Sequence, residues 1–241
     1  MKVNIKLPKS WDELTDRQLR MFQKIQHLTA EAYDVAIWLL INNVGSWQFR
    51  KRRRTELCMY YVPISELKNN YKFIYEDVQR GVFIKHKDFI APMDRLYDFT
   101  IERFSYADDL HNKYLETHDY NYLRHLAAVL YLKKNEFFDW DLQNQRARRF
   151  NLTSKRTLYA MHLCYLGCKN HLINRFPKVY PKIQRKLKKA KNKQSSFMDV
   201  VLQMSGQKFG NYNETKSTRL YTFMSEFQNT IIQHEQIKEK K

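Results

Sequence analysis

The chain has 241 residues, of which 43% are hydrophobic and 15% aromatic, so it can bury a core and is not a disordered segment. Gly and Pro number only 5 each, and so few turn residues argue against a β-sandwich, a barrel or a Gly-rich phosphate-binding fold. The 43 Lys and Arg against 25 Asp and Glu give a net charge of +18, which attracts polyanions or an acidic protein but says nothing of the fold. We therefore expect a mainly α-helical protein.

Helical periodicity is clearest near the amino terminus. Two overlapping capping boxes, Ser10-x-x-Glu13 and Thr15-x-x-Gln18, predict the start of an amphipathic helix that runs to His27. A second helix is expected from Thr29 to about residue 42. Helical spacing returns at 96–114 and 120–132, and a long helix is expected from 153 to 175, where Pro177 ends it.

The stretch 46–64 has a different pattern. Residues of high β propensity at 47–49 and 57–62 flank the basic run 50–54, which favours a short β-hairpin with a basic tip, although a loop fits equally well. The predicted organisation is a main helical, bundle-like domain at 1–177 with this hairpin at 46–64, a basic linker or exposed helix at 178–193, and a small C-terminal helical unit at 194–241.

The three cysteines form no disulfide or zinc framework. Cys164, Cys168 and His171 share one arc of a predicted helix and suggest a zinc site, but the same arc carries Met161 and Leu172. We therefore interpret both thiols as small core residues, because structural zinc sites usually use closely spaced cysteines on loops. An odd and sparse set of cysteines favours a reducing compartment such as the cytoplasm. No apolar run approaches the length of a membrane span, and no signal sequence is expected.

Motifs of enzymatic chemistry are absent from the sequence, which has no Gly-x-Ser-x-Gly, Walker A, His-Glu-x-x-His or Gly-x-Gly-x-x-Gly pattern. The acidic clusters at 108–109 and 136–141 are the only candidates for a magnesium site, and we interpret them as helix-end residues that favour the macrodipole. We expect no enzyme activity and no catalytic, cofactor-binding or metal-binding residues.

The positive charge is concentrated in two runs without acidic residues, 50–54 and 178–193. Together they hold thirteen of the 43 Lys and Arg, so the rest of the chain carries 30 cations against 25 acidic groups. Cations next to aromatic residues suit nucleic-acid backbones and single strands, whereas a solvated face or a patch for an acidic protein is the alternative interpretation. The candidate nucleic-acid-binding residues are Arg50, Lys51, Arg52, Arg53, Arg54, Lys182, Arg185, Lys186, Lys188 and Lys189.

Leu7-Pro8-Lys9-Ser10-Trp11-Asp12-Glu13-Leu14-Thr15 resembles a Leu-Pro-x-x-Trp-x-x-Leu-Thr phrase that opens small proteins from tailed phages and prophages of Bacteroidetes-type hosts. Segments 96–108, 122–131 and 209–221 are similar to later parts of the same proteins. The resemblance implies a tail assembly chaperone, a helical protein thought to coat the tape-measure protein until tail tube subunits displace it.

Our first hypothesis is therefore a non-enzymatic phage structural or assembly protein that acts in the host cytoplasm or as a component of the virion, two alternatives that the sequence leaves open, and that is an oligomer within an assembly. Trp11 and Trp47 are its candidate partner-binding residues, which would hold an amphipathic helix of an acidic virion protein in a groove. The second hypothesis is a nucleic-acid-binding protein that uses the two basic runs, which the charge of +18 suits equally well.

Overall fold

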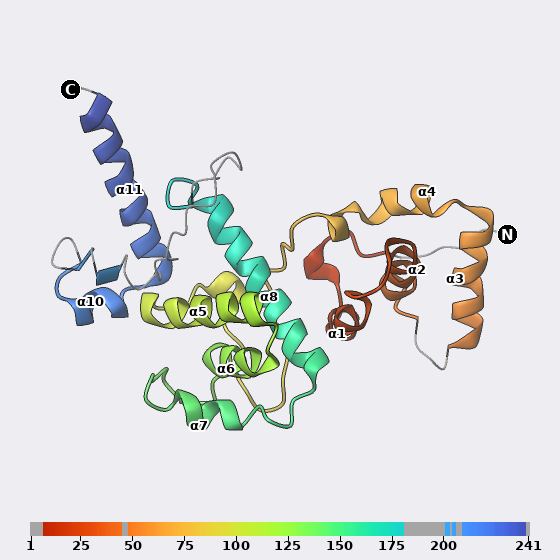
Figure 1. Ribbon diagram of the computed structural model, residues 1–241, viewed down its shortest axis with the longest axis horizontal. Coiled ribbons are helices and arrows are strands. Elements are labelled where there is room, and N and C mark those ends of the chain that lie inside the picture. Colours follow the sequence, from red (N-terminus) through yellow and green to blue (C-terminus); the bar gives the residue numbers. More distant parts are fainter. Residues whose placement is uncertain (1–6, 45–47, 181–200, 203, 206–208, 240–241) are drawn as a thin grey trace. The chain divides into compact units, whose positions relative to one another are not determined.

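The computed structural model describes residues 7–44, 48–180, 201–202, 204–205 and 209–239 (Figure 1). The described part is mainly α-helical as expected, and its β pairing is limited to isolated bridges. The elements in chain order are η1 (Trp11–Glu13), α1 (Asp16–Ile25), α2 (Ala30–Ile41), α3 (Phe49–Tyr61), α4 (Ile64–Lys68), η2 (Asn69–Tyr75), η3 (Asp94–Leu96), α5 (Ile101–Thr117), α6 (Tyr120–Leu130), α7 (Gln143–Arg148), α8 (Lys155–Arg175), α10 (Tyr212–Ser217) and α11 (Leu220–Glu239).

The chain folds into two compact units, each built from two stretches of sequence. The first unit contains Met1–Ile84 and Thr153–Gly167, and the second contains Lys85–Leu152 and Cys168–Lys241. The division at 167 lies inside α8, which starts in the first unit and ends in the second, and the predicted linker at 178–193 lies largely outside the described residues, so it stays a prediction. A boundary inside one continuous helix produces no change of composition that a sequence could reveal.

The first unit begins with one of the two predicted capping boxes. The Thr15 hydroxyl accepts a hydrogen bond from the backbone N–H of Gln18, and the Gln18 side chain accepts one from the backbone N–H of Thr15. The predicted box at Ser10 does not form, because the Glu13 carboxylate accepts from the backbone N–H of Lys9 instead. The first regular helix therefore starts at Asp16.

Helices α1 and α2 form an antiparallel hairpin. Leu19 and Phe22 lie on the apolar face of α1 and are buried in the core, as the sequence pattern predicts. Gln18 links the start of α1 to the end of α2, because its Nε2 donates to the carbonyls of Leu40 (3.1 Å) and Ile41 (3.0 Å). This buried amide holds the two helices together at the open end of the hairpin.

Trp11 lies in the core of the first unit, so its assignment as an exposed partner-binding residue is wrong. Its side chain is 4% exposed, its Nε1 donates to the carbonyl of Phe73 (2.8 Å), and its ring lies 5.3 Å from that of Phe22. The buried Arg80 guanidinium donates to the carbonyls of Trp11 (2.9 Å) and Leu14 (2.7 Å). These partners are distant in sequence, so no local pattern could reveal the burial.

The predicted β-hairpin at 46–64 is also wrong, because residues Phe49–Tyr61 form α3. Arg, Lys, Leu and Glu are strong helix formers, and they fill the middle of this stretch. Arg52 pairs with Glu56 one turn later at 2.8 Å, which supports the helix further. Thr55 fixes α3 to its unit, since it is buried and its carbonyl accepts from Nε1 of Trp38 (2.9 Å).

The second unit is centred on α5 and α6, which a buried arginine joins. Arg103 donates from Nε to the carbonyl of Val129 (2.9 Å) and from Nη2 to that of Leu130 (3.0 Å), and it pairs with Asp98 at 3.4 Å. It thereby satisfies carbonyl groups at the C-terminal end of α6 that have no partner within the helix. Burial lowers the pKa of Arg103 to about 10.

The positions of the two α8 thiols and the apolar content of the helices were both expected from the sequence. Cys164 and Cys168 are fully buried on α8, which confirms their interpretation as core residues. In the part of the chain that the structure describes, no helix combines the length and apolar character needed to cross a bilayer.

Candidate binding groove

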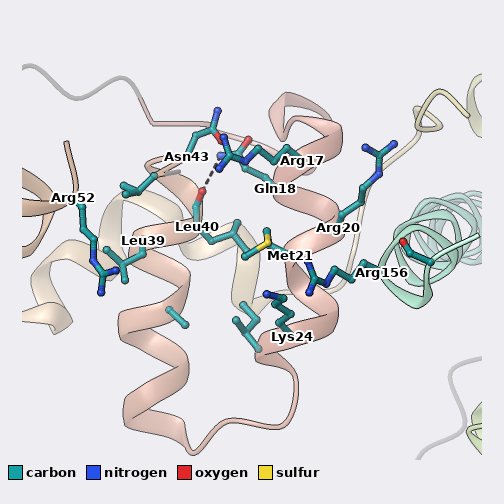
Figure 2. A pocket seen from close by; sticks show the side chains of 14 residues that line it. Arg17, Gln18, Arg20, Met21, Lys24, Leu39, Leu40, Asn43, Arg52 and Arg156 are labelled. Carbon is teal, nitrogen blue, oxygen red and sulfur yellow. Dashed lines mark hydrogen bonds between the residues drawn. The ribbon is translucent and has the colours of Figure 1, made fainter. Parts of the chain in front are cut away.

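A groove of about 610 Å³ lies on the first unit, between α1 and α2 (Figure 2). Besides these two helices, α3 contributes Arg52 to its lining, and the start of α8 contributes Ser154 and Arg156. All of these elements belong to the same compact unit, so the groove is part of one folded body.

The amphipathic pattern of α1 builds one side of the groove. While Leu19 and Phe22 are buried, the residues that line the groove recur every three or four positions, as Arg17, Met21 and Lys24 do. This spacing places their side chains along one face of the helix. The residues of α2 in the lining follow the same rule, so the groove runs along two helical faces.

The rim of the groove is positively charged. Among the lining residues that the structure describes there is no Asp or Glu, and five are cations: Arg17, Arg20, Lys24, Arg52 and Arg156. Arg52 is engaged by Glu56, whereas Arg17, Lys24 and Arg156 form no ion pair with any described residue. Uncompensated cations around a concave surface reinforce one another and attract anionic groups.

The floor of the groove is aliphatic. Its described apolar residues are Met21, Ile25, Ala36, Leu39, Leu40 and Val44, and none of the described lining residues is aromatic. Met21 is 37% exposed, so this surface is open to solvent in the isolated chain. An apolar floor with a polar rim is typical of a surface that takes the apolar side of an amphipathic partner.

Outside the groove, α3 presents a second basic surface. Residues 50–54 are exposed, and Arg52 among them pairs with Glu56. The side chains of Phe49, Tyr60 and Tyr61 are 71%, 82% and 76% exposed. Cations in the first turns of a helix oppose its macrodipole, at a cost of about 0.3–1 kcal/mol each. A helix with this composition is stabilised when an anion neutralises its amino-terminal half.

The predicted site residues occupy different positions in the structure. Trp11 is in the core, and the run Arg50 to Arg54 lies on α3 with only Arg52 lining the groove. Trp47 and the second set of predicted cations lie outside the described residues, so their roles stay predictions: Lys182, Arg185, Lys186, Lys188 and Lys189.

The groove cannot be recognised from the amino-acid sequence. Arg17, Arg20 and Lys24 are visible in the sequence as the polar face of an amphipathic helix, which is also the pattern of an ordinary solvent-facing surface. Arg52 and Arg156 join this face only when α3 and α8 fold against the hairpin. No signal in the sequence places these two residues beside α1.

Groups that could carry out chemistry are not gathered at the groove. Burial raises the pKa of the Cys164 thiol to about 11, which disfavours the reactive thiolate. Burial, together with nearby Lys169, lowers the pKa of His111 to about 3. Among the described residues, no three His, Cys, Asp or Glu side chains are grouped so that they could hold a metal ion.

Comparisons with known proteins identified no significant match to this chain. No protein-family model matches the chain, no curated protein shows significant similarity to it, and no solved structure shows a significant match.

Proposed function

We propose that this protein is a non-enzymatic phage virion-assembly protein, of the tail assembly chaperone type, that holds an acidic segment of another virion protein. The groove of the first unit is the observation that carries this proposal, because its described lining, with five cations, an aliphatic floor and no carboxylate, suits such a segment. The proposed place of action is the host cytoplasm, where virion proteins assemble.

The amino-terminal phrase supports the same proposal. Residues 7–19, which resemble the opening of phage proteins, form η1 and the first turn of α1. They contain Arg17 and Gln18 of the groove lining, and the buried side chain of Trp11 anchors this segment in the core. The part of the chain that carries the resemblance therefore helps to build one wall of the groove.

The test is co-expression of the chain with phage tail proteins, the tape-measure protein included, followed by purification through a tag on the chain. The variant Arg17→Glu/Lys24→Glu reverses two exposed cations of the rim. Its control, Lys113→Glu/Lys134→Glu, makes the same change of net charge at exposed residues of the second unit. We expect the groove variant to lose at least about tenfold in affinity for the tail protein while the control retains it. Equal retention of the partner by both variants, or the absence of any tail-protein complex, would contradict the proposal.

A second candidate function is nucleic-acid binding through α3. The observation that favours it is the exposure of the run 50–54 together with Phe49, Tyr60 and Tyr61, since single strands are held by cations and stacking rings. This surface differs from the groove floor, whose described lining residues include no aromatic ring.

Arg50→Ser/Arg53→Ser/Arg54→Ser tests this candidate and leaves Arg52 of the groove unchanged. Fluorescence anisotropy with a labelled oligonucleotide at several salt concentrations should show weaker binding for every sequence. Each lost phosphate contact should also reduce the slope of log K against log salt by about 0.7. Retention of the wild-type affinity and slope, or no binding by the wild type at low salt, would exclude the α3 surface.

A further inference from the structure

We propose that the occupant of the groove is a short acidic, amphipathic α-helix that lies along α1 and α2. This inference rests on the proposed function in using the same groove. The sequence led us to expect an amphipathic helix held by Trp11 and Trp47; the inference places the helix instead on the groove of α1 and α2 and gives the side-chain pattern that this groove requires. The described walls of the groove, their spacing and their charges carry it.

The walls favour a helical occupant over an extended one. The lining comes from α1, the region of α2, α3 and the start of α8, whose backbone groups are used mainly within these helices. An extended peptide gains affinity by pairing its backbone with a strand edge, and the lining contains no strand. A helix satisfies its own backbone hydrogen bonds and can therefore enter an apolar groove without losing them.

The spacing of the lining residues also suits a helix. Arg17, Met21 and Lys24 follow one another along α1, and Ala36 and Leu39 do so along α2, at intervals of three or four residues. Such rows form ridges with a groove between them, into which the ridge of a third helix can pack. At 1.5 Å per residue, the stretch from Arg17 to Ile25 is about 12 Å long, which corresponds to slightly more than two turns of the occupant.

The positions of the cations define the charge pattern of the partner. Figure 2 shows Arg52 beside Leu39 on one side of the groove, and Arg20 and Arg156 on the opposite side. Carboxylates are therefore expected on both flanks of the apolar stripe of the occupant helix, and the carboxylate that faces Arg52 would share this cation with Glu56 at an exposed site. The aliphatic floor favours this partner over a single-stranded nucleic acid, whose bases stack on aromatic rings, because the described residues of the lining include none.

Binding of designed peptides to the full chain tests the inference. The probe is a labelled peptide of about 14 residues, close to four helical turns, with Leu at every third or fourth position and Glu on both flanks. Its control has the same composition with Leu at alternate positions, which destroys the helical stripe but keeps the charge. We expect the helical peptide to bind at least about tenfold more tightly than the control in fluorescence anisotropy, and to gain helical circular dichroism on binding.

Variants of the chain locate the bound peptide. Arg17→Glu/Lys24→Glu should weaken binding by about tenfold or more, and Met21→Gln by about threefold, whereas Lys113→Glu/Lys134→Glu should change it less than about twofold. Equal affinity for the two peptides, or equal effects of the two charge reversals, would overturn the inference. So would a dimer in size-exclusion chromatography that only the groove variant disrupts, because the occupant would then be a second copy of the chain.

Two further outcomes separate this inference from the proposed function. If an oligonucleotide, and not the peptide, binds in a way that depends on Arg17 and Lys24, the helical partner is excluded and the groove is a nucleic-acid site. If the tail protein depends on the groove but the helical peptide shows no advantage over its control, the inference fails while the proposed function stands. If the peptide binds as expected and no tail protein does, the proposed function fails and the inference stands.

Discussion

Replacement of Gly167 by alanine should destabilise the first unit, even though alanine is favoured over glycine by about 1 kcal/mol inside an exposed helix. Gly167 lies in α8, and an alanine Cβ there would come within 2.9 Å of the carbonyl carbon of Arg80 and closer still to its backbone nitrogen and oxygen. Carbon atoms in contact are normally about 3.5–4.0 Å apart, so the backbone at Arg80 must move by roughly 1 Å.

The cost of that movement follows from the contacts of Arg80. Its guanidinium is buried and donates to the carbonyls of Trp11 (2.9 Å) and Leu14 (2.7 Å). A hydrogen bond from a charged group contributes about 1.5–3 kcal/mol, and overpacking of a core costs about 1–3 kcal/mol. After the gain in helix propensity of about 1 kcal/mol, the free energy of unfolding should fall by about 1.5–5 kcal/mol.

Urea unfolding followed by tryptophan fluorescence measures this change, because Trp11 and Trp38 are both buried in the first unit. We expect a lower urea midpoint for Gly167→Ala and an emission maximum shifted to longer wavelength. Combined with Arg80→Lys, the effect of Gly167→Ala should be smaller than in the wild type, because part of it acts through Arg80. An unchanged or higher midpoint for Gly167→Ala would refute the reasoning.

The second unit supports two further predictions. The pKa of buried His111 is lowered to about 3, so between pH 6.5 and 3 the unfolded chain binds a proton that the folded chain excludes. The free energy of unfolding should therefore decrease as the pH is lowered through this window, by roughly 2 kcal/mol at pH 5. His111→Gln should reduce the drop in urea midpoint between pH 7 and pH 5, and an identical drop in both proteins would contradict this origin. Arg103→Met should cost about 3–5 kcal/mol, because the carbonyls of Val129 and Leu130 lose their buried donor. Thermal unfolding followed by circular dichroism measures this loss, and a change below about 1 kcal/mol would show that water replaces the guanidinium.

Features that depend on near neighbours in the chain could be predicted from the sequence. The capping box of Thr15 and Gln18 forms because its two members are three residues apart. Helix α8 ends at Arg175, two residues before Pro177, since proline restricts the preceding backbone. The burial of Cys164 follows from its place on the apolar arc of the same helix.

The error at α3 has a local cause of a different kind. In the stretch 46–64 the ends have high β propensity and favour a hairpin, whereas the middle consists of strong helix formers and favours a helix. Neither preference is decisive alone. The side chain of Trp38, which donates to the carbonyl of Thr55 (2.9 Å), is a contact that supports the helix and comes from another element. Tertiary contacts commonly override a weak local preference in this way.

The amino-acid sequence by itself determined that this protein is helical and basic, because helical periodicity, scarce Gly and Pro, and net charge are properties of the chain. Only the tertiary structure decided that Trp11 is buried and that Arg17, Arg52 and Arg156 share one groove. The physical reason is that burial and electrostatic potential depend on neighbours in space. The cations of this groove come from three helices that meet only in the folded unit.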